Sequence, residues 1–132
     1  MVTTEVKYAL VMLVDDNPMD NMVNGQLITA SGFAKKIKSF ETGKSMLDFL
    51  RSANMEEIPE IIFLDIIMPG MDGFQFMDEF EKLEEPIRKK CRVVMLSSSD
   101  SFKDLNRANK NKLVRKFINK PLTIEMLAAI NI

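Results

Sequence analysis

The chain has 132 residues, of which 46% are apolar, and its formal net charge is −1. This length is typical of one domain, and the near-zero charge argues against a basic nucleic-acid coat protein or a polyacidic tail. With one cysteine and no histidine, an internal disulfide, a Cys/His zinc site and histidine-dependent catalysis are excluded. The first residues do not resemble a secretory signal and no apolar run is long enough to span a membrane, so we expect a cytoplasmic protein.

Five short segments have the composition of buried β-strands. The first, third and fourth are continuous apolar runs, which are typical of strands covered on both faces of a parallel sheet. The second and fifth are weaker. The predicted strands are residues 9–14, 35–40, 61–64, 93–96 and 116–118.

Five amphipathic helices are predicted between and after these strands. Asn17 followed by Pro18 marks the first start, and this helix is expected to end near Gly32. Its predicted apolar face is Met19, Met22, Val23, Leu27 and Ala30. The other helices are expected to be capped by Thr42, by Asp72, by Asp100 or Ser101, and by Thr123.

The third helix is expected to carry an apolar stripe that runs from Phe74 to Leu83.

Strand–helix alternation repeated five times predicts an α/β fold with a doubly wound, five-stranded parallel sheet. We expect one domain over residues 1–132, with no output domain.

Polar side chains follow the predicted strands, at the edge where doubly wound sheets bind ligands. Asp15 and Asp16 follow the first strand, Asp65 the third, Ser97 the fourth and Lys120 the fifth. Converging carboxylates raise one another's pKa, and a divalent cation such as Mg²⁺ removes that cost. With a hydroxyl and an ammonium on the same rim, the set indicates Mg²⁺-dependent phosphoryl transfer to a carboxylate nucleophile.

Each of these features also has a plain structural explanation. An Asp-Asp pair can be a helix cap and its solvated neighbour, a serine run can be a loop, and Lys-Pro can be a surface turn. Their joint occurrence at successive strand ends favours the functional interpretation.

Four segments carry a resemblance to a known family. They are residues 14–17 (Val-Asp-Asp-Asn), 64–73 (Leu-Asp-Ile-Ile-Met-Pro-Gly-Met-Asp-Gly), 94–98 (Val-Met-Leu-Ser-Ser) and 117–122 (Phe-Ile-Asn-Lys-Pro-Leu). Over essentially the whole chain, the sequence resembles a response regulator receiver domain of two-component signalling, of the single-domain chemotaxis-regulator type. The resemblance implies a flavodoxin-like sheet with strand order 2-1-3-4-5.

The resemblance assigns the phospho-acceptor and the metal ligands. Asp65 matches the aspartate that accepts the phosphoryl group. Asp16 matches the acid that binds Mg²⁺ directly, and Asp15 matches the acid that acts through water or positions the site. Ile67 is expected to offer its backbone carbonyl oxygen to the metal.

The remaining matches concern the phosphoryl group and the switch. Ser97 matches the switch hydroxyl, and Lys120 matches the lysine that meets the phosphoryl oxygens. The backbone N–H of Ser98 is expected to contact the same group, and Phe117 matches the aromatic switch on the fifth strand. The resemblance also implies a cis peptide bond between Lys120 and Pro121.

We therefore predict a phosphorylation-dependent switch rather than an enzyme that acts on a separate substrate. A histidine kinase or a histidine phosphotransfer domain is the expected donor, and an unidentified downstream protein is the expected reader. A monomer or weak dimer is expected, with no nucleic-acid or membrane partner. Met19 and Met22 are assigned to the core in preference to a donor-docking surface.

Charge is unevenly distributed along the chain. Residues 1–85 carry 7 basic and 16 acidic side chains, whereas residues 86–121 carry 11 basic and 2 acidic ones. The basic region is predicted either to meet an acidic partner or to complement the protein's own acidic half. It has neither a recognition-helix pattern nor an aromatic stacking platform, which argues against nucleic acid.

Three alternative functions are considered. A Mg²⁺-dependent phosphatase of the haloacid-dehalogenase type would need an aspartate where Ile67 stands. A flavodoxin-like cofactor binder would need a phosphate-binding loop after the first strand, where Asp15 and Asp16 would repel an anion. A receiver-like scaffold that is not phosphorylated stays open.

Overall fold

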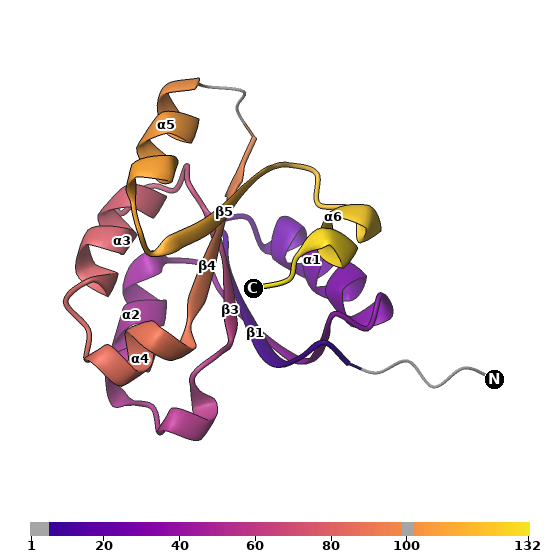
Figure 1. The fold of residues 1–132 in the computed structure, drawn as a ribbon, viewed down its shortest axis with the longest axis horizontal. Coiled ribbons are helices and arrows are strands. Elements are labelled where there is room, and N and C mark those ends of the chain that lie inside the picture. Colours follow the sequence, from indigo (N-terminus) through magenta and orange to yellow (C-terminus); the bar gives the residue numbers. More distant parts are fainter. Residues whose placement is uncertain (1–5, 99–101) are drawn as a thin grey trace.

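In the computed structural model, which describes residues 6–98 and 102–132, the chain forms a parallel sheet between two layers of helices (Figure 1). The strand order β2-β1-β3-β4-β5 confirms the predicted doubly wound, flavodoxin-like α/β fold. The order reverses between β1 and β3, so a crevice forms beyond their carboxyl ends. The strands are β1 (Tyr8–Val14), β2 (Ala34–Phe40), β3 (Ile61–Asp65), β4 (Arg92–Ser97) and β5 (Val114–Asn119).

Helices cover both faces of the sheet (Figure 1). One face packs against α1 (Pro18–Ala30) and α6 (Ile124–Ala129). The other carries a short 3₁₀ helix, η1 (Met55–Glu57), and the helices α2 (Gly43–Ser52), α3 (Gly73–Phe80), α4 (Glu85–Lys90) and α5 (Phe102–Lys110). Within the described residues, no helix is long and apolar enough to cross a membrane.

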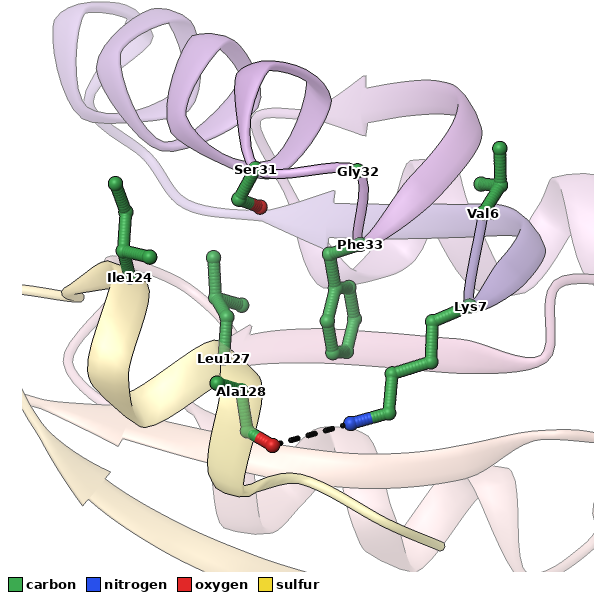
Figure 2. Close-up of a pocket in the computed structure, with 8 residues that line it drawn as sticks. All are labelled: Val6, Lys7, Ser31, Gly32, Phe33, Ile124, Leu127 and Ala128. Carbon is green, nitrogen blue, oxygen red and sulfur yellow. Dashed lines mark hydrogen bonds between the residues drawn. The ribbon is translucent and has the colours of Figure 1, made fainter. Parts of the chain in front are cut away.

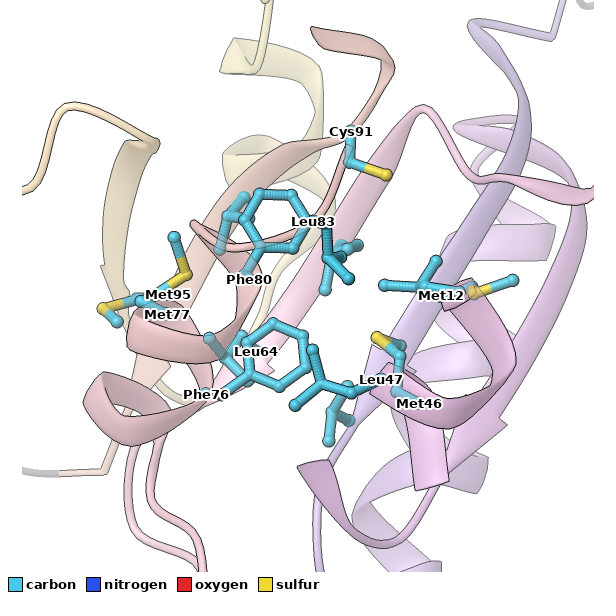
Figure 3. Close-up of a cluster of buried hydrophobic side chains, with 14 of the residues drawn as sticks. Met12, Met46, Leu47, Leu64, Phe76, Met77, Phe80, Leu83, Cys91 and Met95 are labelled. Carbon is cyan, nitrogen blue, oxygen red and sulfur yellow. The ribbon is translucent and has the colours of Figure 1, made fainter. Parts of the chain in front are cut away.

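The larger hydrophobic core lies between the sheet and α2, α3 and α5. Figure 3 shows Met12 and Leu64 of the sheet beside Met46 of α2 and Phe76 and Phe80 of α3. All five side chains are fully buried. Because both sheet faces are covered in this way, the central strands read as continuous apolar runs in the sequence.

Side-chain caps fix where the helices begin. The side chain of Asn17 accepts hydrogen bonds from the backbone of the first turn of α1, and Pro18 follows it as predicted. Thr42, Asp72 and Thr123 cap α2, α3 and α6 in the same way, so these three predicted caps are confirmed. The predicted cap at Asp100 or Ser101 lies outside the described residues.

The third crossover differs from the prediction of one helix per strand. The helix α3 ends at Phe80, so Leu83 is buried outside it, and a further helix, α4, begins at Glu85. Pro86 lies in the first turn of α4, where its fixed φ angle suits a helix start. Three basic side chains in the last turn stabilise α4, because they lie at the negative end of its helix dipole.

The predicted packing face of α1 is wrong for Met19, Met22 and Val23, whereas Leu27 packs against the core on this side of the sheet as predicted. Met19, Met22 and Val23 are 61%, 53% and 52% exposed, whereas Asn21 and Ile28 are buried. The Asn21 amide nitrogen donates hydrogen bonds to the carbonyl oxygens of Asp15 and Phe40, at the ends of β1 and β2. These bonds turn Asn21 towards the sheet, so the apolar side chains beside it face outwards.

Candidate functional site

The three aspartates that the sequence singled out lie together at the carboxyl edge of the sheet. β1 and β3 are adjacent, with Val14 paired to Leu64, so the residues that follow both strands share one crevice. Asp15, Asp16 and Asp65 each offer a carboxylate oxygen, and these atoms lie within 4.8 Å of one another. Asp15 and Asp65 are buried, and Asp16 is exposed. Such a set of oxygen donors fits a hard divalent cation.

Lys120 brings a positive charge into the same crevice. Its Nζ lies 2.6 Å from Asp15 Oδ2, 3.4 Å from Asp65 Oδ1 and 3.5 Å from Asp20 Oδ2. The backbone N–H of Lys120 donates a 2.7 Å hydrogen bond to the carbonyl oxygen of Ser97, which anchors the loop after β5 to the end of β4. The Lys120–Pro121 peptide bond is cis, as the resemblance implied.

Burial and the neighbouring charges shift the pKa values of Asp65 and Lys120. Burial raises the pKa of Asp65, the charge of Asp15 adds to this effect, and Lys120 opposes it, so that the pKa stands at about 6. Burial alone would lower the pKa of Lys120. The hydrogen bond to Asp15 and the nearby carboxylates outweigh burial and raise that pKa, so Lys120 stays charged. At neutral pH the site therefore holds an ionised Asp65 beside a cation.

Asp20 and Asn21 also lie at the crevice, although the sequence pattern did not predict them there. Asp20, in the first turn of α1, supplies the third carboxylate beside Lys120. Asn21 binds the carbonyl of Asp15, and its own Oδ1 has no hydrogen-bond partner among the described residues. Asn21 lies one helical turn after the N-cap Asn17, and a polar side chain at this position in a helix that follows the site was the available signal.

The loop between β3 and α3 folds back on the phospho-acceptor candidate. The backbone N–H of Gly73 donates a 2.8 Å hydrogen bond to the carbonyl of Ile66. A Cβ atom at Gly73 would lie 2.9 Å from the backbone oxygen of Asp65 and 2.9 Å from Ile66 Cα, so only glycine fits here. Gly70, with φ of 82°, turns the middle of the same loop.

The remaining predicted residues lie on β4, on β5 and in the loops that follow β3 and β4. Ser97 is fully buried at the end of β4, whereas Ser98 after it is exposed. Phe117 is half-buried and packs against the larger core. The side chain of Ile67 is exposed; the role predicted for this residue belongs to its backbone carbonyl and stays a prediction.

Ser97 and Phe117 lie on the same face of the sheet. Met95 pairs with Phe117 and Ser97 pairs with Asn119 across β4 and β5. Because side chains alternate along a strand, these four point to one side, which places Phe117 diagonally from Ser97. A change at Ser97 therefore has a short path to Phe117.

A separate hollow contains none of the predicted site residues. It lies between α6 and the turn from α1 to β2, where Phe33 and Leu127 form its apolar floor (Figure 2). Lys7 Nζ donates a 3.3 Å hydrogen bond to the carbonyl of Ala128 across it. The aspartates and the lysine of the predicted site lie at the crevice instead.

Comparison with known proteins agrees with this geometry. Residues 11–131 match the family model of the response regulator receiver domain. The chain belongs to this family. The probable methanogenesis regulatory protein FilR2 of Methanothrix harundinacea is 31% identical over 120 residues, which cover 89% of this chain and 76% of that protein. PilH of Pseudomonas aeruginosa is 25% identical over 90% of this chain and 91% of its own.

Solved receiver structures share the fold. The two-component response regulator from Cytophaga hutchinsonii is 32% identical with a TM-score of 0.83, over 92% of both chains. A response regulator receiver protein from Dyadobacter fermentans is 30% identical with a TM-score of 0.82, over 90% of this chain and 91% of that one. The rice regulator ORR1 is 28% identical, and this chain spans about half of its length. The shared part is thus the receiver unit.

Proposed function

We propose that this receiver domain is a switch that accepts a phosphoryl group on Asp65 and thereby changes a partner-binding surface. The observation that carries the proposal is the buried Asp65 carboxylate, which lies between Lys120 and two further aspartates at the switch point of the sheet. The proposal makes the protein a signalling module whose only catalysis is its own phosphorylation and dephosphorylation.

The acidic cluster fits a bound Mg²⁺ ion. Asp15, Asp16 and Asp65 would hold it through carboxylate oxygens, together with the backbone carbonyl of Ile67. When bound, the ion would offset the mutual repulsion of the carboxylates and the charge of an incoming phosphoryl group. In the protein alone, burial raises the pKa of Asp65 most, and repulsion by Asp15 adds to this effect.

With Mg²⁺ bound, phosphoryl transfer would use protein groups that are already in the crevice. A carboxylate oxygen of Asp65 forms a bond to the phosphorus of a donor phosphohistidine, and the P–N bond breaks with its electron pair left on the imidazole. Lys120, 3.4 Å from Asp65, is placed to balance the charge of the transferred group. Attack by water on the same phosphorus later releases inorganic phosphate and restores the carboxylate.

The exposed face of α1 is the proposed docking surface for the donor. Met19, Met22 and Val23 are each more than half exposed, and α1 begins two residues after Asp16 at the crevice. Apolar side chains beside a reactive carboxylate suit a helical donor such as a histidine kinase or a histidine phosphotransfer domain. The proposal includes a cytoplasmic location, where such donors are supplied with ATP, and a receiver that acts as a monomer or weak dimer.

A phosphoryl group on Asp65 is proposed to draw the hydroxyl of Ser97 towards its oxygens. Ser97 is fully buried, so its movement changes the packing around it. Phe117, diagonally placed on the same face, would turn inwards, and the surface of α5 and β5 would change with it. The downstream protein reads this surface.

Labelling by a small phosphodonor tests the proposal. The wild-type protein is incubated with acetyl phosphate and Mg²⁺, and the acid-labile phosphoryl adduct is located by mass spectrometry. We expect one adduct, on Asp65, that is absent from Asp65→Asn and from protein treated with a chelator. An adduct elsewhere, or labelling of wild type and Asp65→Asn to the same extent, would overturn the proposal, and absence of any adduct would favour a scaffold that is not phosphorylated.

A further inference from the structure

We propose that the outer edge of β2 binds an extended segment of a partner protein in which acidic and apolar residues alternate. The segment would add a strand to the sheet beside β2. The inference goes beyond the proposed function, because it concerns the edge of the sheet opposite β5 and does not depend on phosphorylation of Asp65.

One side of β2 has backbone groups that point away from the sheet. Within residues 6–98 and 102–132, β2 pairs only with β1 and ends the strand order. The N–H of Asp15 donates a 3.1 Å hydrogen bond to the carbonyl oxygen of Phe40. Because backbone groups alternate in direction along a strand, those of Ile37 and Ser39 point to the outer edge. This edge therefore offers the donors and acceptors that an added strand needs.

The side chains of β2 on the face that α2 covers are basic. Lys36 and Lys38 are exposed and line a hollow of about 400 Å³ together with Phe49 of α2. The ammonium of Lys38 lies 4.4 Å from the centre of the Phe49 ring, which holds this cation at the hollow. Carboxylates of a strand that pairs with β2 would lie beside these two lysines.

The charges of these lysines are not neutralised within the described part of the protein. No carboxylate of that part lies within 4.0 Å of Lys36 or Lys38. Glu56 and Glu57 of η1 line the same hollow, but the Glu57 carboxylate accepts a 3.0 Å hydrogen bond from the backbone N–H of Asn54 instead. Uncompensated positive charge favours association with an acidic ligand.

The opposite face of β2 has an apolar character. Ile37 is half-buried and packs against the core on the α1 side. A hollow of about 490 Å³ lies between β2 and α1, and its lining includes Gly25, Thr29 and Ile37. An extended segment paired with β2 would place every second side chain over this hollow and the others over the lysines. Alternation of apolar and acidic residues matches both faces.

A second copy of this chain fits the edge less well than an acidic partner. Two β2 strands side by side would bring Lys35, Lys36 and Lys38 of one chain against the same lysines of the other. Lysines on edge strands oppose such pairing. The same charges attract a segment that carries carboxylates, and the outer backbone groups require that the segment be extended rather than helical.

Peptide titration without Mg²⁺ or a phosphodonor tests the proposal. One fluorescent peptide alternates glutamate and valine, and a second has the same composition with the glutamates and valines in two blocks. The test variant is Lys36→Gln/Lys38→Gln. The matched control is Lys103→Gln/Lys110→Gln, which removes two exposed lysines from α5. Amide hydrogen exchange of the wild type, with and without the alternating peptide, is a second measurement that needs no variant.

We expect the alternating peptide to bind the wild type and the α5 variant alike, and the β2 variant about three- to tenfold more weakly, since two exposed charge pairs are lost. We also expect the bound peptide to slow exchange at the amides of Ile37 and Ser39. If the β2 variant does not fold, exchange in the wild type decides the question.

Three results would rule the proposal out. They are no binding or equal binding of the two peptides, equal losses in the β2 and α5 variants, and unchanged exchange at Ile37 and Ser39. Each would leave the lysines of β2 as protection of the edge against aggregation. Because Asp65 labelling is measured separately, failure here leaves the proposed function standing.

Discussion

The surroundings of Asp65 oppose its ionisation. Burial and Asp15 raise the pKa of Asp65 to about 6, and Lys120 only partly offsets them. Because the unfolded chain has the ordinary pKa of 3.8, folding favours the protonated form. The stabilisation from this residue is complete below about pH 4 and is lost as the pH rises to 6.

Replacement of Asp65 by asparagine is therefore expected to stabilise the protein at neutral pH without metal. A shift of this size corresponds to about 2–3 kcal/mol in the free energy of unfolding, and the difference from wild type should nearly vanish at pH 4. Urea denaturation with a chelator at pH 4 and pH 7.5 measures it, with Asp78→Asn on the exposed side of α3 as control. A wild type as stable as Asp65→Asn at pH 7.5 would mean that the carboxylate is not destabilised.

Asp20 is expected to restrain Lys120. Its carboxylate is 3.5 Å from the ammonium and its side chain is 45% exposed, so it competes with a phosphoryl group for the same cation. We expect Asp20→Asn to bind beryllofluoride, a phosphoryl mimic, about two- to threefold more tightly in the presence of Mg²⁺, an effect of the size of an exposed ion pair. Titration followed by fluorescence or calorimetry measures the affinity, with Asp78→Asn as control. An affinity of Asp20→Asn that is unchanged or weaker than that of the wild type would contradict this expectation.

The sequence is sufficient to predict that Asp15, Asp65 and Lys120 meet in the crevice, but not that Asp20 and Asn21 lie beside them. Asp15, Asp65 and Lys120 follow strands, and the carboxyl edge of a parallel sheet brings such positions together without further information. Asp20 and Asn21 lie near the start of α1 instead. Their direction depends on how that helix is rotated, which hydrogen bonds to β1 and β2 decide.

Gly73 and Gly25 differ in whether the structure has room for a side chain at that position. Gly73 has backbone atoms of Asp65 and Ile66 2.9 Å from the site of a Cβ, whereas Gly25 inside α1 has only Leu13 at 3.8 Å. We expect Gly73→Ala to destabilise the protein by about 1–3 kcal/mol and to weaken Mg²⁺ binding, because the loop must move away from Asp65. Gly25→Ala is expected to stabilise it by about 0.5–1 kcal/mol.

Thermal denaturation with and without Mg²⁺ compares the two variants. Equal stability of the two alanine variants would show that the β3–α3 loop has room to adjust. Retention of full Mg²⁺ stabilisation in Gly73→Ala would separate this loop from the metal site.

The element predictions failed where local pattern and tertiary packing disagree. The apolar residues of α1 predicted a buried face, yet Asn21 is buried in their place because its amide joins two strand ends. The apolar pattern predicts one helix in the third crossover, whereas Pro86 lies in the first turn of a second helix, α4. Apolar periodicity alone did not show either hydrogen bonding to the sheet or a change of helix axis.

At the scale of the whole molecule, alternation of strands and helices was sufficient to predict the fold class. Each central strand is a continuous apolar run, and the caps at Asn17, Thr42, Asp72 and Thr123 mark the helices between them. The division of the core into two layers follows, because a sheet with helices on both faces buries alternate side chains on opposite sides.

We propose that a phosphoryl group on Asp65 changes the α5–β5 surface through Ser97 and Phe117. Amide nuclear magnetic resonance spectra with Mg²⁺, before and after addition of beryllofluoride, test it most directly. We expect shifts at Ser97, at Phe117 and along α5. We expect Ser97→Ala to keep the shifts around Asp65 and to lose those at Phe117 and α5. Shifts that stay confined to Asp65 and its adjoining loop in the wild type would contradict it.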